Sequence, residues 1–196
     1  MEYSTNIHHE PTATTSVKSE APPPRLRGDV ALRVSLFAAT LVAAVVMVTN
    51  KQTQLVPVPG APAGVTILHT AKFRHSPPFV YFAAALSVAC FYSILTTLAS
   101  FWLILKPAFS DKFFLHFVFL DVLMLGVVAS ATGAASAEAY NGLRGNHHVG
   151  WSKVCPVYDR FCVHVATSAI MSLLASFILV SLIMLPVFSL QKRVRH

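Results

Sequence analysis

Residues 113–137 read FFLHFVFLDVLMLGVVASATGAASA, and this stretch decides the fold. It is predominantly apolar, and it holds one carboxylate, Asp121, and one imidazole, His116. A helix needs about 20 residues, each rising 1.5 Å, to cross the hydrocarbon core of a bilayer, and the stretch is long enough. A membrane-spanning strand would need strict alternation of apolar and polar residues, which is missing. The stretch therefore predicts a transmembrane helix.

Three further apolar runs have the same character, at residues 30–49, 79–105 and 163–190. Of the 196 residues in the chain, 55% are hydrophobic and 12% are charged, and the mean hydropathy is +0.61. Charged residues make up about 25% of soluble domains. This composition excludes an ordinary cytosolic enzyme, a disordered protein and a disulfide-dense secreted toxin. It predicts an all-α membrane protein that forms a four-transmembrane-helix bundle.

Polar segments mark the ends of the membrane part. Residues 1–28 contain many Ser and Thr residues and a run of three prolines at 22–24, so we expect a disordered tail there. The four-helix membrane domain is expected at 29–190, followed by a short basic tail at 191–196. No apolar segment of a signal peptide stands before the first run, so we expect that run to serve as its own targeting signal.

An even number of spans places both termini on one side of the membrane. The basic residues beside the first and last runs are Arg25, Arg27, Lys192, Arg193 and Arg195. Because cytoplasmic flanks of membrane helices are rich in Lys and Arg, we expect both termini in the cytosol. The formal net charge of +7 then reflects contacts with membrane lipids, and we expect no nucleic-acid partner because no nucleic-acid-binding motif occurs.

Two longer connections then lie outside, at about 50–78 and 138–162. The first has prolines at 57, 59, 62, 77 and 78 and little helical periodicity, so we expect no helix there.

Arg33 and Asp121 are the formal charges inside the apolar runs. A charge at membrane depth costs a few kcal/mol, so such residues usually face the bundle interior and pair. The first and third runs cross in the same direction and place both residues toward the cytosol, so we expect a pair. The alternative is that Arg33 alone extends to the headgroups. A small transporter or channel that uses Asp121, with a relay through His116, would need more polar residues in series.

Cys155 and Cys162 lie seven positions apart in the second outer connection. Two cysteines in an oxidising compartment predict a disulfide that closes a small loop. The alternative is a zinc site with His147 and His148, but the spacings typical of zinc ligands are missing. Cys90, in the middle of the second run, is expected to be a packing residue.

Small residues recur at four-residue spacing in the last two runs. They are Gly126, Ser130 and Ala134 on one line, Ala129 and Gly133 on another, and Ser168, Ser172 and Ser176 in the fourth run. Small residues let membrane helices approach closely. The pattern fits packing inside one bundle and self-association equally well.

The sequence contains no paired carboxylates, nucleophile elbow, phosphate-binding loop or HExxH motif. We therefore expect no enzymatic activity, no cofactor and no metal.

Taken in order, these features resemble the Casparian strip membrane domain protein-like (CASP-like) family of plants. The resemblance rests on LRVSLFAA at 32–39, on the third run with its Asp, and on the outer segment GNHHVGWSKVCPVYDRFC at 145–162. The stretch HTAKFRHSPPFVYFAAALSVACFYSI at 69–94 is similar to the first subgroup. The resemblance covers about 26–190, and the family is distantly similar to the four-helix MARVEL proteins of animal membranes.

The resemblance implies a non-enzymatic plasma-membrane scaffold that forms homo- and heteromers with family members and recruits cell-wall-modifying proteins. By this resemblance, the intramembrane Arg and Asp of the family correspond to Arg33 and Asp121. The outer Trp and the Cys pair of the family correspond to Trp151, Cys155 and Cys162. Residues 50–78 do not match the first-loop segment of the strip-forming members, so barrier formation is not implied. The rival interpretation is a small transporter or channel using Asp121.

Overall fold

Each of the four apolar runs forms one long helix in the computed structural model of the chain, which describes residues 24–57, 62, 64–105 and 110–194. The helices are α1 (Pro24–Val48), α2 (Pro77–Leu105), α3 (Ser110–Arg144) and α4 (Asp159–Val194). All four are long and apolar enough to cross a membrane, with candidate spans at Gly28–Val48, Pro77–Trp102, Leu115–Arg144 and Asp159–Phe188. The predicted four-helix membrane fold is confirmed.

The helices extend beyond several of the boundaries expected from the sequence. α1 begins at Pro24, inside the segment predicted to be a tail, and proline suits the first position of a helix. Residues 1–23, the rest of that predicted tail, lie outside the described residues. α3 continues past 137 to Arg144, because Ala, Glu and Leu in this stretch favour a helix. α4 begins at Asp159 and runs through most of 191–196, so Cys162 is helical and not in a loop.

A β-hairpin connects α1 to α2, where the sequence indicated only an irregular segment. Strands β1 (Lys51–Pro57) and β2 (Thr66–Lys72) pair antiparallel, with Leu55 opposite Leu68. Pro57 is the last residue of β1, so its missing N–H does not interrupt the hydrogen bonds between the two strands. A short 3₁₀ turn, η1 (Phe73–His75), leads from the hairpin into α2.

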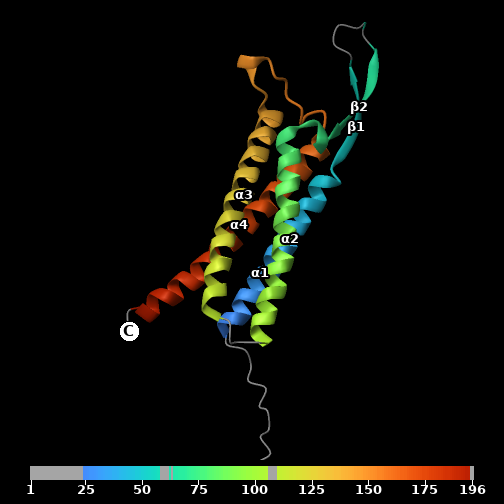
Figure 1. Cartoon of the computed structure of the whole chain (residues 1–196). Helices are drawn as coiled ribbons and strands as arrows, with labels where there is room; N and C mark the ends of the chain where they lie inside the picture. The colour runs from blue at the N-terminus through green and yellow to red at the C-terminus, as the bar shows by residue number, and fades with distance from the viewer. Residues whose placement is uncertain (1–23, 58–61, 63, 106–109, 195–196) are drawn as a thin grey trace, which may run out of the picture.

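The hairpin is fixed to the start of α4 by polar contacts. The side chain of Gln52 accepts a hydrogen bond from Phe161 N at 2.8 Å and donates one to Asp159 Oδ1 at 3.1 Å. Asn50 donates from Nδ2 to Phe161 O at 3.0 Å, and Tyr158 Oη donates to His69 O at 3.3 Å. These contacts tie the α1–α2 connection to the segment that leads into α4; the hairpin and the start of α4 lie at the same end of the bundle (Figure 1).

The helices form a ring in which each one packs against its two neighbours. α1 packs against α2 and α4, and α3 packs against the same two helices, so α1 and α3 are diagonally opposite. The core consists of two apolar clusters. One, around Met47, Phe82 and Phe161, fills the half near the hairpin, and the other, around Leu36 and Leu179, fills the opposite half.

Large apolar side chains also cover the outside of the bundle. Among them, Leu41, Phe91, Phe119 and Phe177 are exposed, one from each helix. An apolar outer surface of this extent is costly in water and favourable in lipid. The C-terminal part of α4 extends away from the other helices (Figure 1).

Candidate functional site

Arg33 of α1 and Asp121 of α3 meet across the diagonal of the bundle. Nη2 of Arg33 lies 3.2 Å from Oδ2 of Asp121, and Nη1 lies 3.5 Å from Oδ1. Arg33 is 3% exposed and Asp121 is 1% exposed. The predicted contact is therefore present, and the alternative in which Arg33 extends alone to the headgroups is wrong for this structure.

Three further side chains complete the site. Tyr92 of α2 donates from Oη to Asp121 Oδ1 at 2.6 Å. Asp29 accepts a hydrogen bond from Arg33 Nε at 3.0 Å and another from Ser100 Oγ at 2.9 Å. We call Asp29, Arg33, Tyr92, Ser100 and Asp121 the polar cluster, which joins α1, α2 and α3.

An aromatic ring completes the surroundings of Arg33. The guanidinium carbon lies 5.2 Å from the centre of the Phe117 ring, within the range of a cation–π contact. Sequence reasoning missed Asp29, although its position four residues before Arg33 is the spacing of a helical ion pair. It also missed the Tyr92 and Ser100 contacts, because nothing in the sequence of an uncharged span shows which way a hydroxyl points.

The polar groups of the cluster satisfy one another. Among the described residues, no buried side-chain nitrogen or oxygen lacks a hydrogen-bond partner. His116 is exposed on α3 and makes no hydrogen bond to Asp121. A relay through these two residues therefore has no support in the geometry. The cluster is a closed set of contacts that holds three helices together.

At the opposite end of the bundle, a disulfide joins Cys155 to Cys162. It links the segment after α3 to the first turns of α4, and the predicted disulfide is confirmed. Both thiols are consumed by this bond, so the zinc alternative does not apply to this form of the protein. Cys155 N and Val154 N both donate to Gly142 O, at 3.1 and 2.8 Å, which anchors the segment to the end of α3.

Trp151 lies in the turn between α3 and the disulfide. Its backbone pairs with that of Asn146 through two hydrogen bonds of 2.9 Å, which close a turn around η3 (His147–Val149). The turn depends on Gly145, where φ is +67° and an added Cβ would lie 2.7 Å from Trp151 O. The Trp151 side chain is 56% exposed and is not part of the polar cluster.

The small residues of the last two helices fall into two groups. On α4, Ser168 and Ser172 are completely buried: Ser168 donates to Ala43 O at 2.7 Å, and Ser172 lies 2.6 Å from Thr132 Oγ1. Ser176, partly buried, bonds to Ser172 O within its own helix. This group therefore packs inside the bundle.

The small residues of α3 face outward instead. Gly126, Ala129, Ser130 and Gly133 are exposed, and Ala134 is partly buried. No atom lies within 4 Å of a Cβ built at Gly126 or Gly133. Ser130 bonds to Tyr81 Oη at 2.9 Å, on the side of α3 toward α2. We call Gly126, Ala129, Ser130 and Gly133 the α3 small-residue face.

The four membrane-length helices, joined by the polar cluster at one end and by the disulfide-linked segment at the other, define a multi-pass membrane protein. A family model described as the Casparian strip membrane protein domain matches residues 23–178, and the chain belongs to this family. A CASP-like protein 1D1 of Populus trichocarpa is 56% identical over 186 residues, covering 91% of this chain and 94% of that protein. A CASP-like protein 1D1 of Vitis vinifera is 53% identical, covering 85% and 79%. The resemblance inferred from the sequence is confirmed. No solved structure matches the chain.

Proposed function

We propose that the protein is a non-enzymatic scaffold that self-associates within the plasma membrane, with both termini in the cytosol. The observation that carries the proposal is the α3 small-residue face. Gly126 and Gly133, two helical turns apart, leave the backbone of α3 open on the outside of the bundle. In membranes, helices associate through close backbone approach at such positions, because lipid tails provide no hydrophobic drive. A second copy of the chain can pack there.

The interior of the bundle supports a scaffold over a transporter or channel. A transport path would need polar groups in series that connect Asp121 to both sides of the membrane. The carboxylate is instead bonded to Arg33 and Tyr92, and the apolar cluster around Leu36 and Leu179 lies beyond it. A closed, packed interior fits a protein that organises its surroundings.

Family membership supports the rest of the proposal. The scaffold associates with other members of the family as well as with itself, and it recruits cell-wall-modifying proteins. The outer connections, held together by the disulfide and the hairpin contacts, form the part that such partners would meet outside the membrane.

The test replaces Gly126 and Gly133 together with leucine. Because no atom lies within 4 Å of either added Cβ, the bundle itself should tolerate both changes. Leucine also has a higher helix propensity than glycine, by about 0.8–1 kcal/mol per site. We expect co-purification of two differently tagged copies from native membranes to fall at least about tenfold, because leucine keeps the α3 backbones apart.

The matched control is Ala38→Leu combined with Ala84→Leu, which enlarges two exposed small residues on α1 and α2. This variant should co-purify like the unaltered protein. Unchanged co-purification of the Gly126→Leu, Gly133→Leu variant would contradict the proposed interface. Proton or ion flux in proteoliposomes that is lost in Asp121→Asn would contradict the scaffold and favour the transporter.

A further inference from the structure

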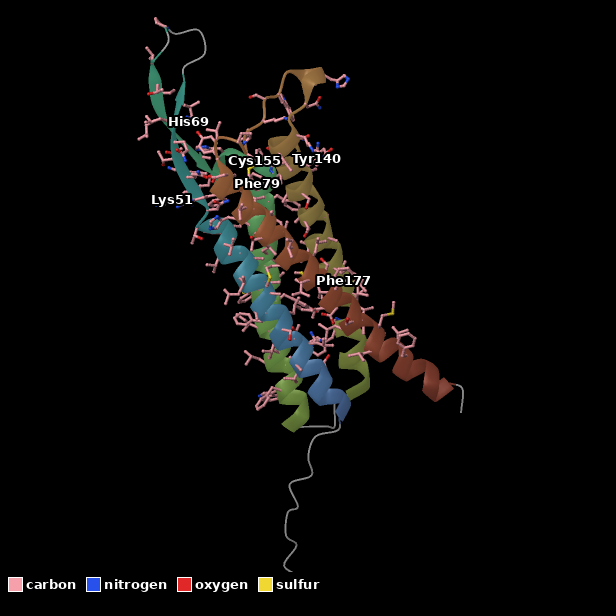
Figure 2. All side chains as sticks on the ribbon, turned by 180° about the vertical axis from the view of Figure 1, so that it is seen from behind. Lys51, His69, Phe79, Tyr140, Cys155 and Phe177 are labelled. Atoms are coloured by element: carbon pink, nitrogen blue, oxygen red, sulfur yellow. A yellow bond between two sulfur atoms is a disulfide. The ribbon has the colours of Figure 1, made fainter. Side chains whose placement is uncertain are left out.

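A pocket of about 460 Å³ lies at the outer end of the bundle, between α2, α3, α4 and the segment that follows α3. Figure 2 labels Phe79 and Cys155 in this region. Small-molecule sites in proteins have volumes of about 300–1,000 Å³. The space is therefore large enough for a small organic ligand, and it is far from the polar cluster at the other end of the molecule.

Aromatic side chains form much of the wall. Phe79 of α2 and Phe161 of α4 are buried, with ring centres 6.0 Å apart, and the exposed Trp151 lines the pocket from the turn after α3. The disulfide and the Gly142 contacts hold this turn in place, so the pocket is built before any ligand arrives.

The charge in the pocket comes from Glu138. Its Oε1 accepts one hydrogen bond, from Ser76 Oγ at 3.0 Å. Within the described residues no Lys, Arg or His forms an ion pair with it, and none is among the residues that line the pocket. A carboxylate without a cationic partner, in a pocket that aromatic rings also line, favours a positively charged ligand.

We propose that this pocket binds a small organic ammonium group, with Glu138 as its counter-ion and Trp151 as its aromatic contact. The ammonium group comes either from a free amine outside the cell or from the headgroup of a lipid in the outer leaflet. Both carry the same chemistry, and the experiment separates them.

The probe is choline, compared with its neutral analogue 3,3-dimethyl-1-butanol, which has the same shape without the charge. Binding is measured by isothermal titration calorimetry on the full chain in a maltoside detergent, which carries no ammonium group. We expect choline to bind at least about tenfold more tightly than the analogue. Equal affinity for both compounds, or no binding of choline, would overturn the proposal. This comparison uses the unaltered protein and does not depend on the folding of a variant.

Glu138→Gln keeps the shape of the side chain and removes its charge, and should weaken choline binding about tenfold. The matched control is Asp159→Asn, which removes one negative charge from the same end of the molecule, outside the pocket lining. It should leave the affinity unchanged. An equal loss in both variants would mean that choline responds only to the overall charge of this end, and the proposed site would be wrong.

Fluorescence locates the ligand. The chain has two tryptophans, so Trp102→Phe leaves Trp151 as the only indole emitter. Choline should change its emission with the same affinity that calorimetry gives, and an emission that does not respond would place the ligand elsewhere.

Nanodiscs then separate the two sources of the ammonium group, at high ionic strength to screen the lipid charge. Weaker choline binding in phosphatidylcholine than in phosphatidylglycerol discs identifies a lipid headgroup as occupant, and equal binding identifies a free amine.

Discussion

At the scale of single residues, Arg33 holds the polar cluster together because two carboxylates share it. Asp29 and Asp121 both lie within ion-pair distance of the guanidinium, at 3.0 and 3.2 Å. Each carboxylate also has a neutral donor, Ser100 or Tyr92. Loss of Arg33 would leave two negative charges facing each other, whereas loss of the Asp121 charge would leave Arg33 paired with Asp29. Loss of the Arg33 charge should therefore destabilise the protein more than loss of the Asp121 charge.

This inequality predicts an order of stability among variants. Arg33→Leu should destabilise the protein by about 3–5 kcal/mol, the usual cost of removing one partner from a buried ion pair. Asp121→Asn should cost less, about 1–3 kcal/mol, because Arg33 keeps Asp29 and the amide can still accept from Tyr92. Unfolding in mixed detergent micelles measures the free energies. The combination of both changes should cost less than the sum of the single changes, and strict additivity would show that the two residues act separately.

Tyr92 offers a separate prediction. Tyr92→Phe removes only the hydroxyl whose oxygen lies 2.6 Å from Asp121 Oδ1. Loss of a hydrogen bond to a buried charged group should cost about 1.5–3 kcal/mol in the same unfolding measurement. Tyr81→Phe is the control, because the Tyr81 hydroxyl bonds to exposed Ser130 and should matter little. Equal effects of the two variants would contradict a special role for Tyr92.

The Arg33–Asp121 contact could be predicted because charges are rare in apolar runs and few partners exist. The sign of the charge and the depth along two parallel spans were enough to match them. The hydroxyl partners could not be found this way. Ser, Thr and Tyr occur throughout the spans, and many bond to the carbonyl one turn earlier, as Thr40 does to Leu36. Only the rotation of each helix about its axis, which is set by packing, selects the few that face Asp121.

At the scale of elements, the segment between α3 and α4 is a tight structure set by one glycine and one disulfide. α3 ends where Gly145 adopts φ of +67°, and the chain then folds back so that Asn146 pairs with Trp151. The disulfide fixes the second half of the segment to α4. Two predictions separate these contributions.

Gly145→Ala should destabilise the protein by about 1–3 kcal/mol, because a left-handed conformation strains any residue with a Cβ. The added carbon would also lie 2.7 Å from Trp151 O, so the turn must shift. Thermal unfolding in detergent provides the measurement. Gly28→Ala is the control, because no atom lies within 4 Å of its added Cβ. A Gly145→Ala protein as stable as the control would show that the turn adapts without strain.

Replacing both Cys155 and Cys162 with serine should loosen the segment while the helices remain. In the chain-entropy model a loop of this size contributes about 2–3 kcal/mol. We expect faster hydrogen exchange in 146–158 and unchanged exchange in the centres of α1 and α2. Mass spectrometry after alkylation without reductant first checks that the unaltered protein has no free thiol at these two positions. Exchange that is the same with and without the disulfide would show that backbone contacts alone hold the segment.

Sequence patterns predicted the helices of this fold but not all of their ends, and they did not predict the hairpin. Long apolar runs predicted all four helices. A segment that crosses a bilayer must form its backbone hydrogen bonds within itself and must be about 20 residues long. Helix ends were placed less well, since α3 continues past residue 137 through Glu138, Asn141 and Arg144. The hairpin was missed because its prolines suggested irregular chain. Its strands depend on distant contacts, such as that of Gln52 with Phe161 N, which no local pattern reveals.

At the scale of the whole molecule, the two ends of the bundle differ in chemistry. The start of α1 and the end of α4 lie at one end (Figure 1). The polar cluster, with Asp29 and Arg33 in the first turns of α1, joins the helices near this end. The hairpin and Cys155 of the disulfide lie at the other end (Figures 1 and 2). The residues that line the pocket belong to this end as well. Disulfides form in oxidising compartments, so the end that carries Cys155 and Cys162 should be the outer one. The basic flanks of the first and last helices favour the same orientation.

This orientation predicts which parts of the chain outside reagents can reach. Tags at either terminus should be protected in intact cells and become accessible after permeabilisation. An epitope inserted between His148 and Val149, at the exposed turn after α3, should be accessible without permeabilisation. An accessible N-terminal tag would reverse every segment and place Cys155 and Cys162 in the reducing cytosol, where the disulfide should not persist. The topology measurement and the thiol measurement therefore test each other, and both must agree for the pocket to face outward.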